Sequence, residues 1–286
     1  MVGEGTRVSR ALRFGISTCP NDTFAFHALL TGAVRCEGFD VEFVLADVEE
    51  LNERLASGEL QLSKGSFALA IERSADLCVL ASGAALGFGV GPVLLARESA
   101  RPLDADSRVL APGAHTTANL LFRLLHPGAP LPEQCVFSRI MPALANGAAD
   151  YGVCIHEGRF TYAEHGLRLV EDLGASWEAR TRSPLPLGGI FAHRRLGSEV
   201  LCAVSDAVGR SIDWARAHPD GALETMREHA QEQRDDVLWK HVELYVNDWT
   251  RELGDVGRAA IAALEREARA AGLLSAAAPG LEVVGG

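Results

Sequence analysis

The first two thirds of the chain alternate short apolar runs with segments of helical periodicity. The apolar runs are rich in β-branched residues and leucine and have the length of buried strands, at 12–17, 41–46, 60–62, 78–81, 93–96, 107–110, 135–139, 153–155, 167–170 and 190–193. Between them, apolar residues recur with helical spacing at 24–30, 48–57, 67–71, 118–125 and 141–149. Strands that alternate with helices predict an α/β fold with a mainly parallel sheet.

From Ser198 onward the pattern is purely helical, with segments at 200–217, 222–229, 237–246 and 256–271. Two crossings, near Gly91-Pro92 and near Pro186-Gly188, carry no helical pattern. We therefore expect two lobes with a central cleft: residues 1–92 plus 188–286 form the larger lobe, and residues 93–187 form the smaller one. The alanine-rich tail from Ser275 is expected to fray.

Composition narrows the class of protein. The 286 residues carry a formal net charge of -11, with 27 Lys and Arg against 38 Asp and Glu, which argues against a nucleic-acid partner or an anionic membrane surface. No apolar stretch is long enough to span a membrane, and 1–13 lacks the apolar core of a signal peptide, so we expect a cytoplasmic protein. The six cysteines show no CxxC spacing and are expected to be buried, reduced thiols.

Four strand-to-helix junctions bring polar residues to the expected cleft, because ligands bind at the carboxyl ends of strands in such sheets. These junctions are 19–23, 64–66, 115–117 and 155–157. Thr116 and Thr117 begin a helix, where hydroxyls and free N–H groups favour a carboxylate, although one of the two threonines can be only the cap. Asn21 to Thr23 form a turn that either binds an anion or caps a helix, and Asn52 faces either solvent or the cleft.

His156 follows the expected strand at 153–155. Its side chain can gain or lose a proton near neutral pH, because the unperturbed pKa of histidine is about 6.5. The residue is therefore a candidate general base, and the alternative is a histidine that only caps the backbone. We assign no chemistry to His27, His126, His218 and His241, which lie in helical patterns or before prolines.

No metal or cofactor is expected. His156-Glu157 lacks the second histidine of HExxH, since Phe160 occupies that position. The glycine-rich passage 83–92 leads into a strand, whereas a dinucleotide-binding loop opens a helix.

Several ordered blocks resemble one enzyme family, the 1,4-dihydroxy-6-naphthoate synthases of the futalosine route to menaquinone. They cover nearly the whole chain: STCPNDTF at 17–24, DVEELN at 47–52, PGAHTTA at 112–118, IHEGRFTY at 155–162, PLPLG at 184–188 and YVN at 245–247. The chain departs from the family pattern at Thr18, where proline is usual, and at Gly65-Ser66-Phe67.

The resemblance implies a two-lobed fold similar to type II periplasmic binding proteins. It also implies a lyase reaction that converts cyclic dehypoxanthine futalosine to 1,4-dihydroxy-6-naphthoate, with a small-molecule carboxylate as substrate. The family's catalytic base corresponds to His156, and its substrate-contacting positions correspond to Asn52, Lys64, Gly65, Ser66, Thr116, Thr117 and Ile155.

Two alternatives stay open. A non-catalytic solute-binding module would share the lobes and bind a ligand without consuming it. A chorismate dehydratase of the same pathway would share the fold, but the blocks at 112–118 and 155–157 favour the synthase. The sequence leaves the oligomeric state open, and also whether His115 assists as a second acid.

Overall fold

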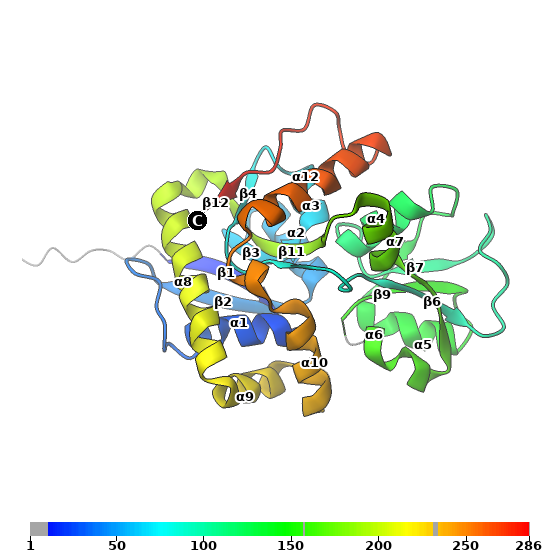
Figure 1. Ribbon diagram of the computed structural model, residues 1–286, viewed down its shortest axis with the longest axis horizontal. Helices are drawn as coiled ribbons and strands as arrows, with labels where there is room; N and C mark the ends of the chain where they lie inside the picture. Colours follow the sequence, from blue (N-terminus) through cyan, green and yellow to red (C-terminus); the bar gives the residue numbers. More distant parts are fainter. Residues whose placement is uncertain (1–10, 157, 231–233, 286) are drawn as a thin grey trace, which may run out of the picture.

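The computed structural model describes residues 11–156, 158–230 and 234–285. Two parts of the sequence expectations lie outside the described residues. These are most of the segment 1–13, which was searched for a signal peptide, and Glu157 of the expected site. Two β-sheets stand side by side, each covered by helices, and the chain crosses between them twice (Figure 1). No helix among the described residues is long and apolar enough to cross a membrane.

The first sheet has seven strands and contains both ends of the described chain. Its spatial order is β12-β4-β11-β3-β1-β2, and β5 pairs with β11. β1 and β2 are parallel and in register from Leu12 opposite Val41 to Ser17 opposite Ala46. The strands are β1 (Leu12–Ser17), β2 (Val41–Ala46), β3 (Leu62–Ser66), β4 (Leu77–Leu80), β5 (Ala85–Gly87), β11 (Leu185–His193) and β12 (Val283–Val284).

The second sheet has five strands in the order β10-β6-β9-β7-β8. Its strands are β6 (Val93–Arg97), β7 (Val109–Ala111), β8 (Glu133–Gln134), β9 (Tyr151–Cys154) and β10 (Leu167–Asp172). β6 begins at the first expected lobe boundary, whereas the second expected boundary, between 187 and 188, falls inside β11. The division of the chain into lobes at these residues stays a prediction.

The expectation of a mainly parallel sheet is met only in part, because both sheets are mixed. β1 runs parallel to β2 and β3, β4 runs parallel to β12, and β7 runs parallel to β8 and β9. β11 runs antiparallel to β3, β4 and β5, and β6 runs antiparallel to β9 and β10. β6 and β11 are the strands by which the chain passes from one sheet to the other. Such strands are not joined to their neighbours by a helical crossover, so nothing requires them to be parallel.

Helices cover the first sheet on both sides. α1, α9 and α10 lie below the sheet in Figure 1, and α8, which packs against α1, runs alongside the sheet. α2, α3 and α12 lie near the other strands, and α11 contacts β5. Their bounds are α1 (Pro20–Leu30), α2 (Val48–Ala56), α3 (Phe67–Glu72), α8 (Ser198–Ala217), α9 (Pro219–His229), α10 (Asp235–Tyr245), α11 (Asp248–Arg251) and α12 (Gly254–Ala270).

The second sheet is covered by shorter helices. These are α4 (Thr117–Leu125), α5 (Ile140–Ala145), α6 (Gly158–Thr161) and α7 (Leu173–Thr181). Three 3₁₀ turns complete the described helices: η1 (Phe137–Arg139), η2 (Tyr162–His165) and η3 (Arg194–Leu196).

The structure differs from the sequence expectations in three of the chain's irregular parts. The segment 135–139 is not a strand, because the run of apolar residues there ends in the 3₁₀ turn η1. The crossing near Pro186 is strand from Leu185 onward, and the pairing of β11 with β5 shifts register between Pro186 and Gly188, which accommodates the missing N–H of proline. α7 was not expected at all.

The tail beyond Ser275 also differs from the expectation of fraying. Its strand β12 pairs with β4, Leu281 is buried, and the Leu281 N–H donates to Glu265 Oε1 at 2.7 Å. The alanine-rich segment therefore ends in a strand that completes the edge of the first sheet.

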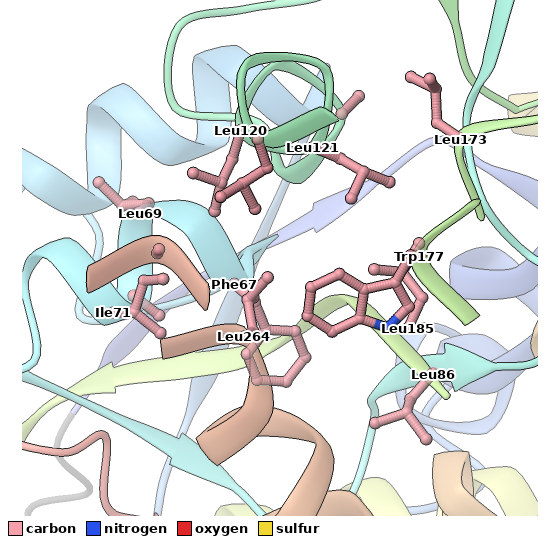
Figure 2. Close-up of a cluster of buried hydrophobic side chains, with 14 of the residues drawn as sticks. Phe67, Leu69, Ile71, Leu86, Leu120, Leu121, Leu173, Trp177, Leu185 and Leu264 are labelled. Atoms are coloured by element: carbon pink, nitrogen blue, oxygen red, sulfur yellow. The ribbon is translucent and has the colours of Figure 1, made fainter. Parts of the chain in front are cut away.

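A hydrophobic core connects the two sheets. Leu94 of β6 and Val79 of β4 belong to one cluster of buried side chains, so the core does not stop at the boundary between the sheets. Figure 2 shows its middle, where α3, α4, α7, β11 and α12 contribute Phe67, Leu69, Leu120, Leu121, Leu173, Trp177, Leu185 and Leu264. Burial of this apolar surface holds the two sheets together. It therefore fixes the positions of the strand ends that face the expected cleft.

Candidate active site

A cleft lies where the two sheets meet. It is lined by residues from the ends of β1, β3 and β9, from the starts of α1 and α4, and from α10 and β11. Seven of the eight residues expected in the site line this cleft: Lys64, Gly65, Ser66, Thr116, Thr117, Ile155 and His156. The eighth, Asn52, lies directly behind Ser66.

His156 is held in an uncommon backbone conformation. It follows β9 with a φ of 56°, in the left-handed region that few residues other than glycine adopt. Its ring lies edge-on to Phe137 at 4.8 Å, and Cys19 Sγ is 3.4 Å from Nδ1 and 3.6 Å from Nε2. Backbone strain of this kind is concentrated at functional sites, where it aims a side chain into a cleft.

The turn expected at Asn21 to Thr23 is instead the first turn of α1. Pro20 can occupy the first helical position because no N–H is needed there, and Cys19 is the N-cap, without a side-chain cap hydrogen bond. The helix therefore starts earlier than its apolar residues indicate. Asn21 and Asp22 are both buried and face the cleft.

A buried ion pair forms the floor of the cleft. Lys64 Nζ lies 2.7 Å from Asp22 Oδ1 and also donates to the Gly83 carbonyl at 3.1 Å. Ser17 Oγ donates to Asp22 Oδ2 at 2.5 Å, and Asn21 Nδ2 donates to Asp22 Oδ1 at 2.8 Å. The carboxylate thus has three donors, which compensate for its removal from water.

His241 of α10 joins the same network, although it lies in an apolar helical pattern and was assigned no chemistry from its sequence context. It is 1% exposed, and Asn21 Oδ1 lies 3.0 Å from its Nε2. Burial lowers the pKa of His241 well below its ordinary value of 6.5, and the nearby His156 and Lys64 lower it further. One signal was present: His241 precedes Tyr245 by four residues, so the two side chains share one face of the helix, and both line the cleft.

Asn52 faces Ser66 rather than solvent, which settles the alternative that the sequence left open. Its Oδ1 accepts from the Ser66 N–H at 2.9 Å, and its Nδ2 donates to Ser66 Oγ at 3.1 Å. A Cβ on Gly65 would approach Asn52 Oδ1 to 2.9 Å, so glycine leaves the room that this amide needs. Asn52 therefore fixes the orientation of Ser66 at the end of β3.

Glu49 of α2 connects Asn52 to the segment before α4. Its Oε2 accepts from Asn52 Nδ2 at 3.1 Å, and its Oε1 accepts from the His115 N–H at 3.0 Å. His115 itself lies outside the cleft lining, near Glu72.

The two threonines have separate roles in the protein. Thr116 is the N-cap of α4: its Oγ1 accepts from the Asn119 N–H at 3.2 Å. Thr117 Oγ1 donates to the Leu187 carbonyl at 2.7 Å and accepts from the Ala68 N–H at 3.2 Å, which ties α4 to β11 and α3. The N–H groups of the first turn of α4 lack intrahelical acceptors and carry the positive end of the helix dipole.

The cysteines are less uniform than expected. Cys36, Cys78 and Cys154 are buried, and burial raises the pKa of Cys78 to about 11 and that of Cys154 to about 12. Cys19 and Cys135 are only half-buried, and Cys202 is exposed on α8. Among the residues that the structure describes, no cluster of His, Cys, Asp and Glu could hold a metal ion.

Arg159 hydrogen-bonds the first crossing between the sheets, at Gly91 near the cleft. Its Nη1 donates to the Gly91 carbonyl at 2.5 Å, and its Nη2 binds Asp172 Oδ2 at 2.6 Å. Gly91 packs so tightly on Gly174 of α7 that an added Cβ would lie 2.1 Å from the Gly174 Cα. Glycine at position 91 is therefore required by close packing.

Comparison with solved structures shows the fold. A Candida albicans protein described as exhibiting the generic periplasmic binding protein structural fold superposes with a TM-score of 0.64 at 16% identity, and the match covers 93% of this chain and 91% of that one. The chain thus has the periplasmic-binding-protein-like fold that the sequence predicts.

Comparison with known sequences shows the family. Residues 12–270 match the family described as "Menaquinone biosynthesis". A 1,4-dihydroxy-6-naphthoate synthase from Thermus thermophilus is 47% identical over 92% of this chain and 96% of its own length, and one from Streptomyces coelicolor is 42% identical over 94% and 96%. The chain belongs to the menaquinone biosynthesis family.

Proposed function

We propose that this chain is a 1,4-dihydroxy-6-naphthoate synthase, a carbon–carbon lyase in which His156 acts as general base on cyclic dehypoxanthine futalosine. The observation that carries the proposal is the position of His156 at the end of β9, aimed into a cleft that also holds the start of α4. The 47% identity to the Thermus thermophilus synthase supports the choice of reaction.

The substrate's carboxylate would bind at the start of α4. The N–H groups of Thr117 and Ala118 are at the first two positions of a nine-residue helix, and both residues line the cleft. A carboxylate there gains hydrogen bonds and the favourable end of the helix dipole. Ser66 Oγ and the backbone of Gly65 also line the cleft, where they can bind a second polar group of the substrate.

The rest of the cleft suits an aromatic ring. Its apolar lining includes Val48, Ala85, Val90, Ile155 and Leu187. Burial of the ring system against these side chains would orient the polar groups, as in most small-molecule sites. Lys64 contributes indirectly: its ammonium is paired with Asp22, and this pair holds the end of β3 beside the substrate.

His156 would remove a proton as the bond to the sugar-derived fragment breaks. A neutral imidazole suffices for this step, and a well-placed general base contributes about 10²–10⁴-fold to the rate. The aromaticity of the naphthoate product supplies much of the driving force. The proposal includes a small-molecule carboxylate as substrate and a cytoplasmic location, and it involves no cofactor.

The decisive experiment is incubation of purified protein with cyclic dehypoxanthine futalosine and, separately, with chorismate. Formation of 1,4-dihydroxy-6-naphthoate from the first compound alone would support the proposal. Consumption of chorismate would support the dehydratase, and binding of either compound without turnover would support a solute-binding module.

A further inference from the structure

We propose that Cys19 is a positioning residue for the reaction: its sulfur lies against the face of the His156 imidazole and holds that ring in the orientation in which it removes a proton. This inference rests on the proposed function, in which His156 is the general base, and extends it to a residue that has been given no role above. The contact joins the two sides of the cleft, because Cys19 follows β1 of the seven-stranded sheet and His156 follows β9 of the five-stranded sheet.

The orientation of the His156 ring is not determined by its own bonds. The torsion that rotates an imidazole about its bond to Cβ has broad, roughly two-fold energy wells, so neighbouring groups must select one orientation. His156 is only half-buried, and its backbone has the left-handed φ of 56°. The ring therefore depends on side-chain contacts, and Phe137 of η1 supplies one of them from the five-stranded side.

The distances place the Cys19 sulfur over the face of the ring. Sγ is 3.4 Å from Nδ1 and 3.6 Å from Nε2 of His156, so it is almost equally far from both nitrogens. A sulfur in the plane of the ring could reach both nitrogens at these distances only by colliding with a ring carbon. The sulfur consequently lies above the plane, where a large, polarisable atom makes favourable contact with an aromatic ring and hinders its rotation.

Cys19 occupies a position where a cysteine contributes little to its helix. It is the N-cap of α1, and its side chain makes no cap hydrogen bond. Serine, threonine, asparagine and aspartate are the residues that stabilise a helix there, because a side-chain oxygen accepts from an N–H group of the first turn. The thiol instead contacts His156 in the cleft. The chain thus lacks a stabilising cap at the place where it gains a contact with the base, a compromise that is common at functional sites.

Two substitutions at this position separate a role in folding from a role in positioning. In Cys19→Ser the hydroxyl is a strong helix cap, so it should turn toward the N–H groups of α1 and away from the imidazole. In Cys19→Ala both the cap and the sulfur are absent. If Cys19 served only the fold, turnover would follow stability, and the serine variant would be at least as active as the native chain. If it positions His156, both variants lose turnover although the serine variant is stable.

The test measures kcat, KM and the midpoint of thermal unfolding for both variants, with cyclic dehypoxanthine futalosine as substrate. We expect kcat to fall by about 10- to 10²-fold in both, because a small displacement of a reacting group has an effect of this size, while KM stays within about twofold of the native value. Cys19→Ser should unfold at or above the native midpoint. The matched control is Cys202→Ser, at an exposed position of α8, which should change none of the three quantities.

A native kcat in Cys19→Ser would overturn the proposal, and so would a raised KM with an unchanged kcat, which would assign the thiol to substrate binding. A shift of more than about one pH unit in the ascending limb of the pH–rate profile of Cys19→Ala would overturn it as well, because the thiol would then share the proton of the base and take part in the chemistry. These results leave the proposed function standing. Absence of 1,4-dihydroxy-6-naphthoate with the native chain would instead remove the proposed function, and this inference with it.

Discussion

The two sides of the cleft are built in different ways. On the side of the seven-stranded sheet, Asp22, Asn52 and Lys64 are at most 6% exposed, and each makes at least two polar contacts within the protein. On the side of the five-stranded sheet, His156 is half-buried, its backbone is in the left-handed region, and its ring contacts Cys19 and Phe137.

This difference separates two tasks. A network of satisfied, buried polar groups is rigid, since any displacement would leave charges or amides unpaired in a dry environment. A half-buried imidazole keeps access to a substrate and can exchange its proton. The first side therefore supplies the fixed frame for binding, and the second supplies the reactive group, so mutations on the two sides should separate stability from turnover.

The largest effect is expected from Lys64→Met. The substitution keeps most of the side chain's volume but leaves the Asp22 carboxylate buried without its cation, so the free energy of unfolding should fall by about 3–5 kcal/mol. Urea denaturation measures this change. The matched control is Asp206→Asn, which removes the exposed partner of Arg210 on α8 and should cost no more than about 0.5 kcal/mol. Similar losses of stability in both variants would show that the buried Lys64–Asp22 pair contributes no more to folding than an exposed ion pair.

The next effect should fall on turnover alone. His156→Asn removes the base but keeps a polar side chain that tolerates the left-handed backbone, so the rate of naphthoate formation should drop by about 10²-fold or more. The midpoint of thermal unfolding should stay close to that of the native chain. Turnover near the native level would exclude His156 as the base. A large fall in the midpoint of thermal unfolding would show that His156 mainly stabilises the fold.

Much of the fold is predictable because local patterns determine it. β1 and β2 occur at the residues that their apolar runs indicate, and the C-terminal helices begin and end within a few residues of expectation. The direction of β11 was not predictable, because it depends on how the chain returns between two sheets. β12 was missed for a related reason: its two valines become a strand only by pairing with β4, which is some 200 residues earlier in the chain.

The candidate site shows the same limit. The junction residues were identified because strand ends and helix starts meet at one edge of a sheet, and seven of the expected residues line the cleft. His241 was missed because its helix has an ordinary apolar pattern, and nothing local shows that Asn21 will contact it across 220 positions. The partners of the Thr117 hydroxyl, Ala68 and Leu187, are likewise distant in sequence.

A smaller effect is expected from Thr117→Val, which alters the connection between the two sides. Valine has the shape of threonine but cannot donate to the Leu187 carbonyl or accept from the Ala68 N–H, so two hydrogen bonds are lost at about 1 kcal/mol each. We expect the free energy of unfolding to fall by about 2 kcal/mol. The affinity for a naphthoate carboxylate should change little if the backbone N–H groups of α4 bind it. A loss confined to carboxylate affinity, with stability unchanged, would instead assign the hydroxyl to the ligand.

The smallest effect concerns the pH dependence of stability on the rigid side. Burial lowers the pKa of His241, so below pH 6.5 the unfolded chain binds a proton at this residue that the folded chain does not. Acid therefore favours unfolding, and the contribution of His241 should reduce stability by about 1 kcal/mol between pH 7.5 and 5.5. His27 and His193, whose pKa values burial also lowers, act in the same direction. Urea denaturation across this range should give a shallower slope for His241→Phe than for the native chain. Parallel slopes would mean that His241 takes up a proton in the folded protein, so that its buried imidazole is not neutral.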